Sequence, residues 1–275
     1  MSNNNITFIG GGNMATSLIS GLIADGYDKA HITVSDPDSD KLAQLAARCG
    51  VHTQVDNSAA VLGAEVVVLA VKPQVLKAVA QGLAASIQQV KPLVISIAAG
   101  VKESVLQEWL GGDVALVRSM PNTPAMIQSG ATGLHAGSAV TESQRNQAES
   151  ILRAVGITRW VENESQMDAV TAVSGSGPAY FFLIMEAIEA SARQMGLDDE
   201  TAHLLTLQTA LGAARMAFES SDSPAVLREK VTSPGGTTER ALGILEEGDI
   251  RTLFNKALQG AMERSIELSD MLGER

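Results

Sequence analysis

The segment Gly10-Gly-Gly-Asn-Met-Ala15 constrains the fold of this chain more than any other part of the sequence. It joins a short apolar run, Ile6–Ile9, to a stretch with helical spacing of apolar residues, Asn13–Ala24. In a Gly-x-Gly-x-x-Ala pattern the first glycine permits a tight turn and the second lets the backbone approach a pyrophosphate, while the small third residue allows close helix packing. The phosphates of a ligand would lie at the helix N-terminus. The segment therefore predicts a dinucleotide site at the first strand–helix junction.

Apolar runs and helical patterns alternate through the first half of the chain. The β-branched run Glu65–Val71 is typical of a strand that is buried on both faces of a parallel sheet. Helical patterns separate the runs, and one of them, Lys41–Cys49, is expected to end at Gly50. Further strands are expected at His31–Ser35, Val51–Gln54, Leu93–Ile97, Val114–Arg118 and Ile157–Val161. This alternation predicts βαβ units, a mostly parallel sheet and an α/β fold.

The second half of the chain has a different pattern. After Pro121 come short Gly- and Thr-rich runs over 130–137, and then a capping-box start to a helix at Thr141 and Gln144. No strand is expected from Asp168 onward. Long amphipathic helices are expected instead at Pro178–Met195, Asp198–Glu219 and Asp249–Leu272. We expect two domains, 1–164 and 165–275, and the small residues of the second domain suggest a subunit interface.

Composition limits the classes of partner. The formal net charge of −11 argues against binding to nucleic acid or anionic membranes, whose phosphates attract Lys and Arg. The single cysteine, Cys49, excludes an internal disulfide and is expected to be a packing residue. The start of the chain lacks the pattern of a signal peptide, and no apolar run reaches the ~18 residues of a membrane span. A cytoplasmic protein is the expectation.

The residue type at the end of the second strand bears on the choice between NAD and NADP. An acidic residue there binds a ribose 2′-hydroxyl and rejects a 2′-phosphate, and Asp36 lies close to the expected place. A shift of one residue would instead turn Ser35 toward the ribose, so the sequence leaves the choice open. Lys72, after the fourth strand, is as well explained by contact with a phosphate as by exposure to solvent.

A second cluster of ligand-binding residue types lies at Val231–Leu242. Thr232, Ser233, Thr237 and Thr238 surround Pro234 and two glycines ahead of a helical pattern. Hydroxyls, glycine backbone and a helix N-terminus together favour an anion. The histidines do not have metal-ligand spacing, and no nucleophile with a histidine partner is evident. The redox chemistry is therefore expected to come from a cofactor. Because no general base is evident, reduction of a C=N bond is a better candidate reaction than oxidation of an alcohol, which usually needs such a base.

Several motifs carry a resemblance to a known family. Beside the first glycine segment they are Ala70–Pro73, Arg118–Pro124, Ser174–Tyr180 and Thr232–Thr238 followed by Ala241-Leu242. Over essentially its full length the chain resembles the pyrroline-5-carboxylate reductases. The resemblance implies NAD(P)H-dependent reduction of 1-pyrroline-5-carboxylate to L-proline, the last step of proline biosynthesis. It also implies a Rossmann-type, doubly wound sheet followed by an all-α dimerisation domain that interlocks with a second subunit, in dimers or larger rings.

The resemblance also assigns roles to particular residues. The residues expected to line NADP(H), or NAD(H), are Gly10, Gly11, Gly12, Asn13, Met14, Ser35, Asp36, Asn57, Ala70, Val71, Lys72, Pro73, Ala98, Ala99 and Gly100. Those expected to contact the substrate are Glu164, Ser233, Gly235, Gly236, Thr237 and Thr238. Thr238 is the expected proton donor to the ring nitrogen. The loop that holds it is expected to serve the site of the partner subunit.

Two alternatives remain to be weighed. A β-hydroxyacid dehydrogenase-like enzyme would need a catalytic lysine in the helical pattern that begins at Pro178, and that pattern has none. A dinucleotide-binding protein without turnover would not need the hydroxyl-rich second cluster. Both alternatives are therefore weaker than imine reduction.

Overall fold

The computed structural model describes residues 4–273. It divides into two compact units, and each is described here by itself. The first comprises 4–176 together with 260–273, and the second comprises 177–259. The sequence-based domain boundary between residues 164 and 165 stays a prediction about how the chain is organised.

The first unit is built around an eight-stranded sheet with the order β3-β2-β1-β4-β5-β6-β7-β8. All neighbouring strands are parallel except β6 and β7. From β1, strands are added in one direction as far as β3 and then in the other direction from β4 onward. The switch point between β1 and β4 is the place where such sheets bind their ligands. The expected mostly parallel, doubly wound sheet is confirmed. The strands are β1 (Ile6–Ile9), β2 (Ile32–Ser35), β3 (His52–Gln54), β4 (Val66–Leu69), β5 (Leu93–Ser96), β6 (Leu116–Met120), β7 (Gly130–Ala136) and β8 (Gly156–Trp160).

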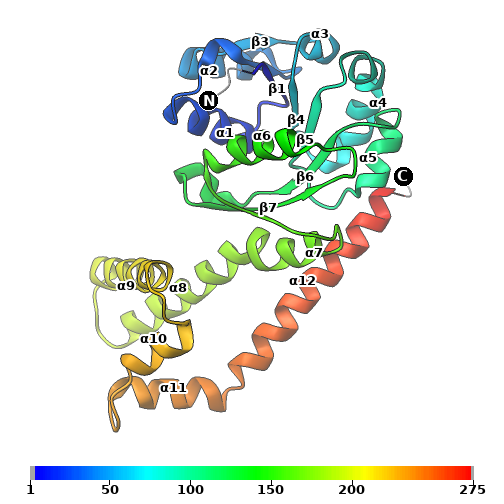
Figure 1. Ribbon diagram of the computed structural model, residues 1–275. Coiled ribbons are helices and arrows are strands. Elements are labelled where there is room, and N and C mark those ends of the chain that lie inside the picture. Colours follow the sequence, from blue (N-terminus) through cyan, green and yellow to red (C-terminus); the bar gives the residue numbers. More distant parts are fainter. Residues whose placement is uncertain (1–3, 274–275) are drawn as a thin grey trace. The chain divides into compact units, whose positions relative to one another are not determined.

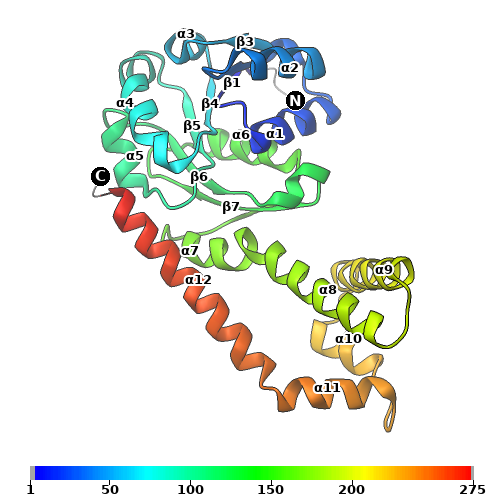
Figure 2. The ribbon, with the colours of Figure 1, turned by 180° about the vertical axis from the view of Figure 1, so that it is seen from behind.

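Helices cover both faces of this sheet (Figures 1 and 2). Phe8 and Val68 point into one core, while their neighbours Ile9 and Leu69 point into the other, as the two-residue period of a strand requires. The first core is closed by α1 (Asn13–Ala24), α2 (Ser39–Cys49) and α6 (Glu142–Arg153). The second is closed by α3 (Asn57–Val61), α4 (Pro73–Val90) and α5 (Glu103–Trp109), with Leu272 packed beside them. Both cores consist mainly of aliphatic side chains.

Local signals in the sequence set several helix ends as expected. Gly50 adopts a left-handed conformation with φ 69° and ends α2. Thr141 and Gln144 form the complete capping box at the start of α6. The segment 130–137, which has no clear strand pattern, contains β7, which pairs with β6 on one side and β8 on the other. Two short 3₁₀ segments, Lys29–His31 and Thr123–Ile127, complete this part of the chain.

After β8 the described part of the chain forms helices joined by short loops, and no further strand. In the first unit lie α7 (Gln166–Val170), a π-helical turn at Thr171–Gly175 and the end of α12 (Ile250–Gly273). In the second unit α8 (Gly177–Gln194) packs along α9 (Asp199–Glu219), and α10 (Pro224–Lys230) and α11 (Thr237–Glu247) follow. These helices match the expected ones, including the helix expected after the Thr232–Thr238 segment, and add α10. Within 4–273 no helix is long and apolar enough to span a bilayer.

Candidate functional site

Gly10 connects β1 to α1 at a point where two chain segments touch. Its φ is +102°, and a Cβ built there would lie 2.7 Å from the carbonyl oxygen of Ala70, which follows β4. Its N–H donates to the Ser35 carbonyl at 2.7 Å. A side chain at this position would be strained and would also push β1 away from the β4 loop. Glycine is therefore required here by the backbone itself.

Gly12 is different because the space around it is open. Its φ is −73°, and a Cβ built there would meet no atom within 4 Å. Gly12 and Asn13 are exposed, and Gly12 is the N-cap of α1 without any side-chain hydrogen bond to that helix end. The N-terminus of a helix favours an anion through its N–H groups and its dipole. The pyrophosphate of a dinucleotide thus fits the open volume beside Gly12 and the start of α1.

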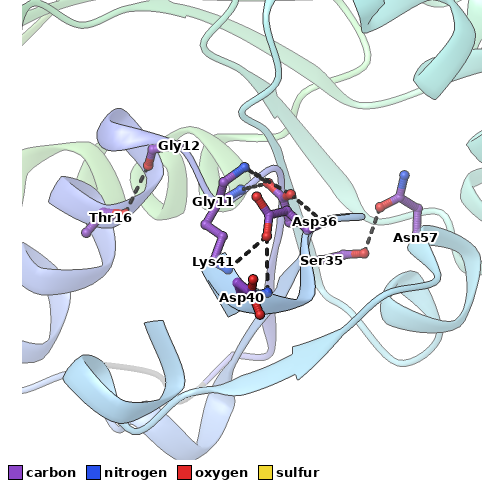
Figure 3. Close-up of polar contacts among 9 residues, drawn as sticks. Gly11, Gly12, Thr16, Ser35, Asp36, Asp40, Lys41 and Asn57 are labelled. Atoms are coloured by element: carbon purple, nitrogen blue, oxygen red, sulfur yellow. Dashed lines mark hydrogen bonds and ion pairs between the residues drawn. The ribbon is translucent and has the colours of Figure 1, made fainter. Parts of the chain in front are cut away.

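Asp36 is held by four hydrogen bonds at the end of β2 (Figure 3). Oδ2 accepts from the Gly11 N–H at 2.8 Å and from Lys41 Nζ at 2.9 Å. Oδ1 accepts from the Asp38 N–H and from Lys41 Nζ, both at 3.0 Å. Burial alone would raise the pKa of Asp36, but the hydrogen bonds from Gly11, Lys41 and Asp38 outweigh it and hold the pKa below its ordinary value. The carboxylate is therefore ionised near neutral pH.

Ser35 is fully buried, and its hydroxyl donates to Asn57 Oδ1 at 2.7 Å. Asn57 is half-buried in the first turn of α3, which Asp56 caps. The serine thus orients the asparagine, whose amide NH₂ group remains to donate. Of the two residues that the sequence left as alternatives for facing the ribose, neither is freely exposed.

The loops after β4 and β5 complete the carboxyl edge of the sheet. Lys72 is exposed and is the N-cap of α4, with Pro73 in the first helical position. Ala70 and Val71 are half-buried beside Gly10. Ala98 and Gly100 are buried, and a Cβ on Gly100 would contact Leu272 at 3.6 Å. Ala99, between them, is partly exposed. The expected cofactor residues therefore gather along one edge, with Ser35, Ala98 and Gly100 behind its surface.

Glu164 lies in the first unit and forms an ion pair with a buried arginine. Arg118 Nη1 donates to Glu164 Oε1 at 2.5 Å, and the Glu103 N–H donates to the same oxygen at 2.5 Å. The Arg118 side chain is 9% exposed. Glu103 in turn lies 3.6 Å from His135 Nε2. Sequence reasoning missed the pairing of Arg118, although an arginine inside an apolar strand signals a buried acidic partner.

The second expected cradle lies in the second unit, between α10 and α11. Gly235 has φ +73°, and a Cβ on Gly236 would lie 2.9 Å from the Ser233 carbonyl oxygen. Gly236 caps α11 without a side-chain hydrogen bond, and the Gly235 N–H donates to Glu239 Oε2 at 2.7 Å. Ser233 and Thr237 are exposed, and Thr238 is half-buried. The carboxylate of Glu239 thus accepts a hydrogen bond from one N–H of this turn.

Among residues 4–273, no three His, Cys, Asp or Glu side chains are grouped so as to hold a metal ion. The lone Cys49 is buried at the end of α2, as expected for a packing residue.

Comparison with known proteins agrees with this arrangement. A family model described as pyrroline-5-carboxylate reductase dimerisation matches residues 164–268, and one described as NADP oxidoreductase coenzyme F420-dependent matches residues 5–100. The pyrroline-5-carboxylate reductase of Pseudomonas aeruginosa is 50% identical over 274 residues and covers all of both chains. A structure from Coxiella burnetii, described as a pyrroline-5-carboxylate reductase, is 53% identical with a TM-score of 0.94 and covers 98% of this chain and 99% of its own.

A more distant structure bears on the cofactor. The pyrroline carboxylate reductase of Plasmodium falciparum, solved with NADP bound, is 27% identical with a TM-score of 0.86 and covers 98% of this chain and 99% of its own. Fold, glycine loop and comparisons together define a Rossmann-type oxidoreductase with a helical self-association domain. Within that class, the chain belongs to the pyrroline-5-carboxylate reductase family, as the sequence motifs indicated.

Proposed function

We propose that this chain reduces 1-pyrroline-5-carboxylate to L-proline with NADPH or NADH, in the last step of proline biosynthesis. The observation that carries the proposal is the open N-terminus of α1 beside Gly12, at the switch point between β1 and β4. It is supported by full-length similarity to reductases named for this reaction. A nicotinamide dinucleotide, when bound, supplies the hydride. The protein must hold both reactants and place a proton donor.

The cofactor residues of the proposal lie along the carboxyl edge of the sheet. Gly12, Asn13 and Met14 would hold the pyrophosphate, and Ala70–Pro73 and Ala99 would line the crevice beside it. Gly10 and Gly11 act by shaping the turn, Ser35 by orienting Asn57, and Asp36 through its hydrogen bonds to Gly11 and Lys41. Ala98 and Gly100 support the loop from behind. NADP(H) is the expected cofactor, since a relative binds NADP.

Apart from Glu164, the substrate residues of the proposal lie in the turn before α11 and in the first two residues of that helix. The substrate carries one carboxylate, which the N–H groups of Gly236 and Thr237 and the hydroxyls of Ser233 and Thr237 can bind. Such charge-assisted hydrogen bonds contribute about 1.5–3 kcal/mol each. Hydride addition at ring C5 sends the C=N electron pair to nitrogen, which takes a proton, and Thr238 is the proposed donor. Glu164 would influence substrate binding only indirectly, through its ion pair with Arg118.

We further propose that the turn acts in the site of a partner subunit. Self-association follows from the dimerisation domain of the family. A dimer, or a ring built from dimers, would bring the α10–α11 turn of one chain to the glycine loop of another. The cytoplasmic location expected from the sequence belongs to the same proposal, and cell fractionation tests it.

The primary experiment follows the oxidation of NADPH with pyrroline-5-carboxylate and identifies proline as the product. Thr238→Ala is expected to lower turnover while the dissociation constant of NADP⁺ stays unchanged, because the residue touches only the substrate side. Thr232→Ala is the matched control, since the hydroxyl of Thr232 is already used: it donates to the Arg228 carbonyl at the end of α10 at 2.6 Å. Unchanged turnover in Thr238→Ala would remove its role as donor. No substrate-dependent oxidation in wild-type protein would overturn the function.

A mixing experiment tests the shared site. Gly12→Glu would block the pyrophosphate but keep the turn, and Thr238→Ala would do the reverse. If the turn acts across subunits, mixed dimers hold one intact site each, and a reassociated equal mixture recovers about a quarter of wild-type activity. If the turn acts within its own chain, the mixture shows only the mean of the two variants.

A further inference from the structure

Lys41 is a charged residue in the cofactor crevice to which the motifs assign no role. It lies in the first turn of α2, and its Nζ bridges both carboxylate oxygens of Asp36 (Figure 3). A Cβ built on Gly11 would lie 3.3 Å from Lys41 Cδ, so the aliphatic stem of the lysine packs against the glycine loop. The adenosine ribose of a dinucleotide held by that loop lies beside the end of the second strand. Lys41 is therefore placed where the 2′-position of that ribose arrives.

Asp36 has no acceptor site left for a ribose hydroxyl. An ionised carboxylate has about four lone-pair sites. The Gly11 N–H, the Asp38 N–H and two contacts from Lys41 fill them. The side chain of Asp36 is only 7% exposed. Asp36 can bind a 2′-hydroxyl only if one of these donors leaves, so its usual role in NAD recognition is blocked.

Lys41 keeps both exposure and hydrogen-bonding capacity. Its side chain is 40% exposed, and an ammonium has three N–H donors, of which Asp36 uses two. The segment Ser35–Lys41 holds three aspartates and only this one cation. Without Lys41, the charged side chains of this segment would all be carboxylates, which repel a phosphate. Asn57, which Ser35 orients, presents further N–H donors in the first turn of α3.

We propose that Lys41 determines the choice of dinucleotide in this chain by cancelling the charge of Asp36 and donating a hydrogen bond to the 2′-phosphate of NADP(H). The inference rests on the proposed function, because it requires that a dinucleotide binds at the glycine loop. NAD(H) has only a hydroxyl at this position and gains little from a cation. Removal of Lys41 would also free the acceptor sites of Asp36, which favours the hydroxyl over the phosphate.

The test measures binding without turnover. Calorimetric titration of full-length wild-type protein and of Lys41→Met uses NADP⁺, NAD⁺, and the fragments 2′,5′-ADP and 5′-AMP. Met keeps the stem that packs on Gly11 but removes the charge. The dissociation constants of NADP⁺ and 2′,5′-ADP are expected to rise about tenfold to a hundredfold, as for a lost charge-assisted hydrogen bond, while those of NAD⁺ and 5′-AMP change little. Lys41→Arg is expected to retain most of the preference for the phosphate.

Two comparisons separate this role from a structural one. Lys29→Met removes the same charge at the opposite end of β2, where Lys29 is exposed, and is expected to leave all four constants unchanged. Lys41→Gln is a second neutral variant, which serves if Lys41→Met does not fold. An equal loss of NAD⁺ and NADP⁺ binding, or an unchanged ratio, overturns the inference while the proposed function stands. Wild-type protein that binds neither dinucleotide overturns both.

Discussion

The two compact units differ in how far they bury their own apolar side chains. In the first, Phe8, Leu69 and Val94 have no exposed surface, and two continuous cores lie against the sheet. In the second, Phe181 and Phe182 are each 63% exposed and Phe218 is 75% exposed. The buried residues of 177–259 are Gly177, Ala192, Ala202 and Thr206, none of them large. A single chain thus gives the first unit a core and leaves the second largely without one.

This difference separates the two tasks of the protein. A unit that buries little apolar surface gains little free energy of folding from the hydrophobic effect. Exposed apolar faces on α8 and α9 can be covered by another copy, which agrees with the family model for dimerisation over 164–268. Stability of the second unit then depends on protein concentration, whereas the first unit stabilises its dinucleotide crevice by itself. The variants below are ordered by the size of the expected effect.

The largest effect is expected for a charge on an exposed apolar face of the second unit. Phe181→Glu places a carboxylate where we expect a partner to pack, so association must desolvate it. The free energy of association should weaken by ~4 kcal/mol or more, a change of about a thousandfold in the dissociation constant. Sedimentation at several concentrations measures this, and activity should fall with the associated fraction. Phe181→Leu, which stays apolar, is the control; a Phe181→Glu protein that assembles normally would place the interface elsewhere.

The next effect tests whether the first unit depends on its own backbone contacts. Gly10→Ala forces a side chain onto φ +102° and against the Ala70 carbonyl, so the free energy of unfolding should fall by about 2–4 kcal/mol. Gly12→Ala is the matched variant, because its Cβ meets nothing and its φ is ordinary. Its free energy of unfolding should lie within about 0.5 kcal/mol of the wild-type value, but it should bind NADP⁺ more weakly. Urea denaturation measures the stability of each variant, and titration with NADP⁺ measures its binding. Equal stability of the two variants would contradict the idea that only Gly10 is required by the backbone.

The sequence predicts the first unit well because each local signal agrees with the sheet. The glycine loop, Gly50 and the capping box at Thr141 all occur as expected. Two kinds of feature could not be predicted from the sequence. β7 lacks an apolar run because its glycines pack closely, with a Cβ on Gly133 falling 2.5 Å from Val170 Cγ1. The pairings of Asp36 with Lys41 and of Arg118 with Glu164 depend on side-chain positions, which no period in the sequence encodes.

A smaller effect is expected from the partly buried ion pair that Asp36 forms with Lys41 in the first unit. Asp36→Asn should lower the free energy of unfolding by about 1.5–3 kcal/mol at pH 7, since it weakens hydrogen bonds to a carboxylate. The pKa of Asp36 is lower in the folded state than in the unfolded state. The ionised carboxylate therefore contributes its full stabilisation above the unfolded pKa of about 4, and this stabilisation is lost as pH falls through the folded-state pKa. Urea denaturation of both proteins from pH 7 to pH 3 should show the difference shrinking only below about pH 4. A difference that is constant across this range contradicts the assignment.

The smallest effect is expected for an ion pair in the second unit. Its N–O distances are similar to those between Lys41 and Asp36, but it lies at the surface. Arg251 donates to both oxygens of Glu246, through Nη2 at 2.7 Å and Nε at 2.9 Å, and its hydrogen bond lowers the pKa of Glu246. Both side chains are well exposed, so water and salt screen the pair. Glu246→Gln should therefore leave the urea midpoint unchanged, at low salt as well as at high salt. A loss of stability comparable with that of Asp36→Asn would mean that another copy buries this pair in the assembly, and the loss should then vanish in the monomeric Phe181→Glu background.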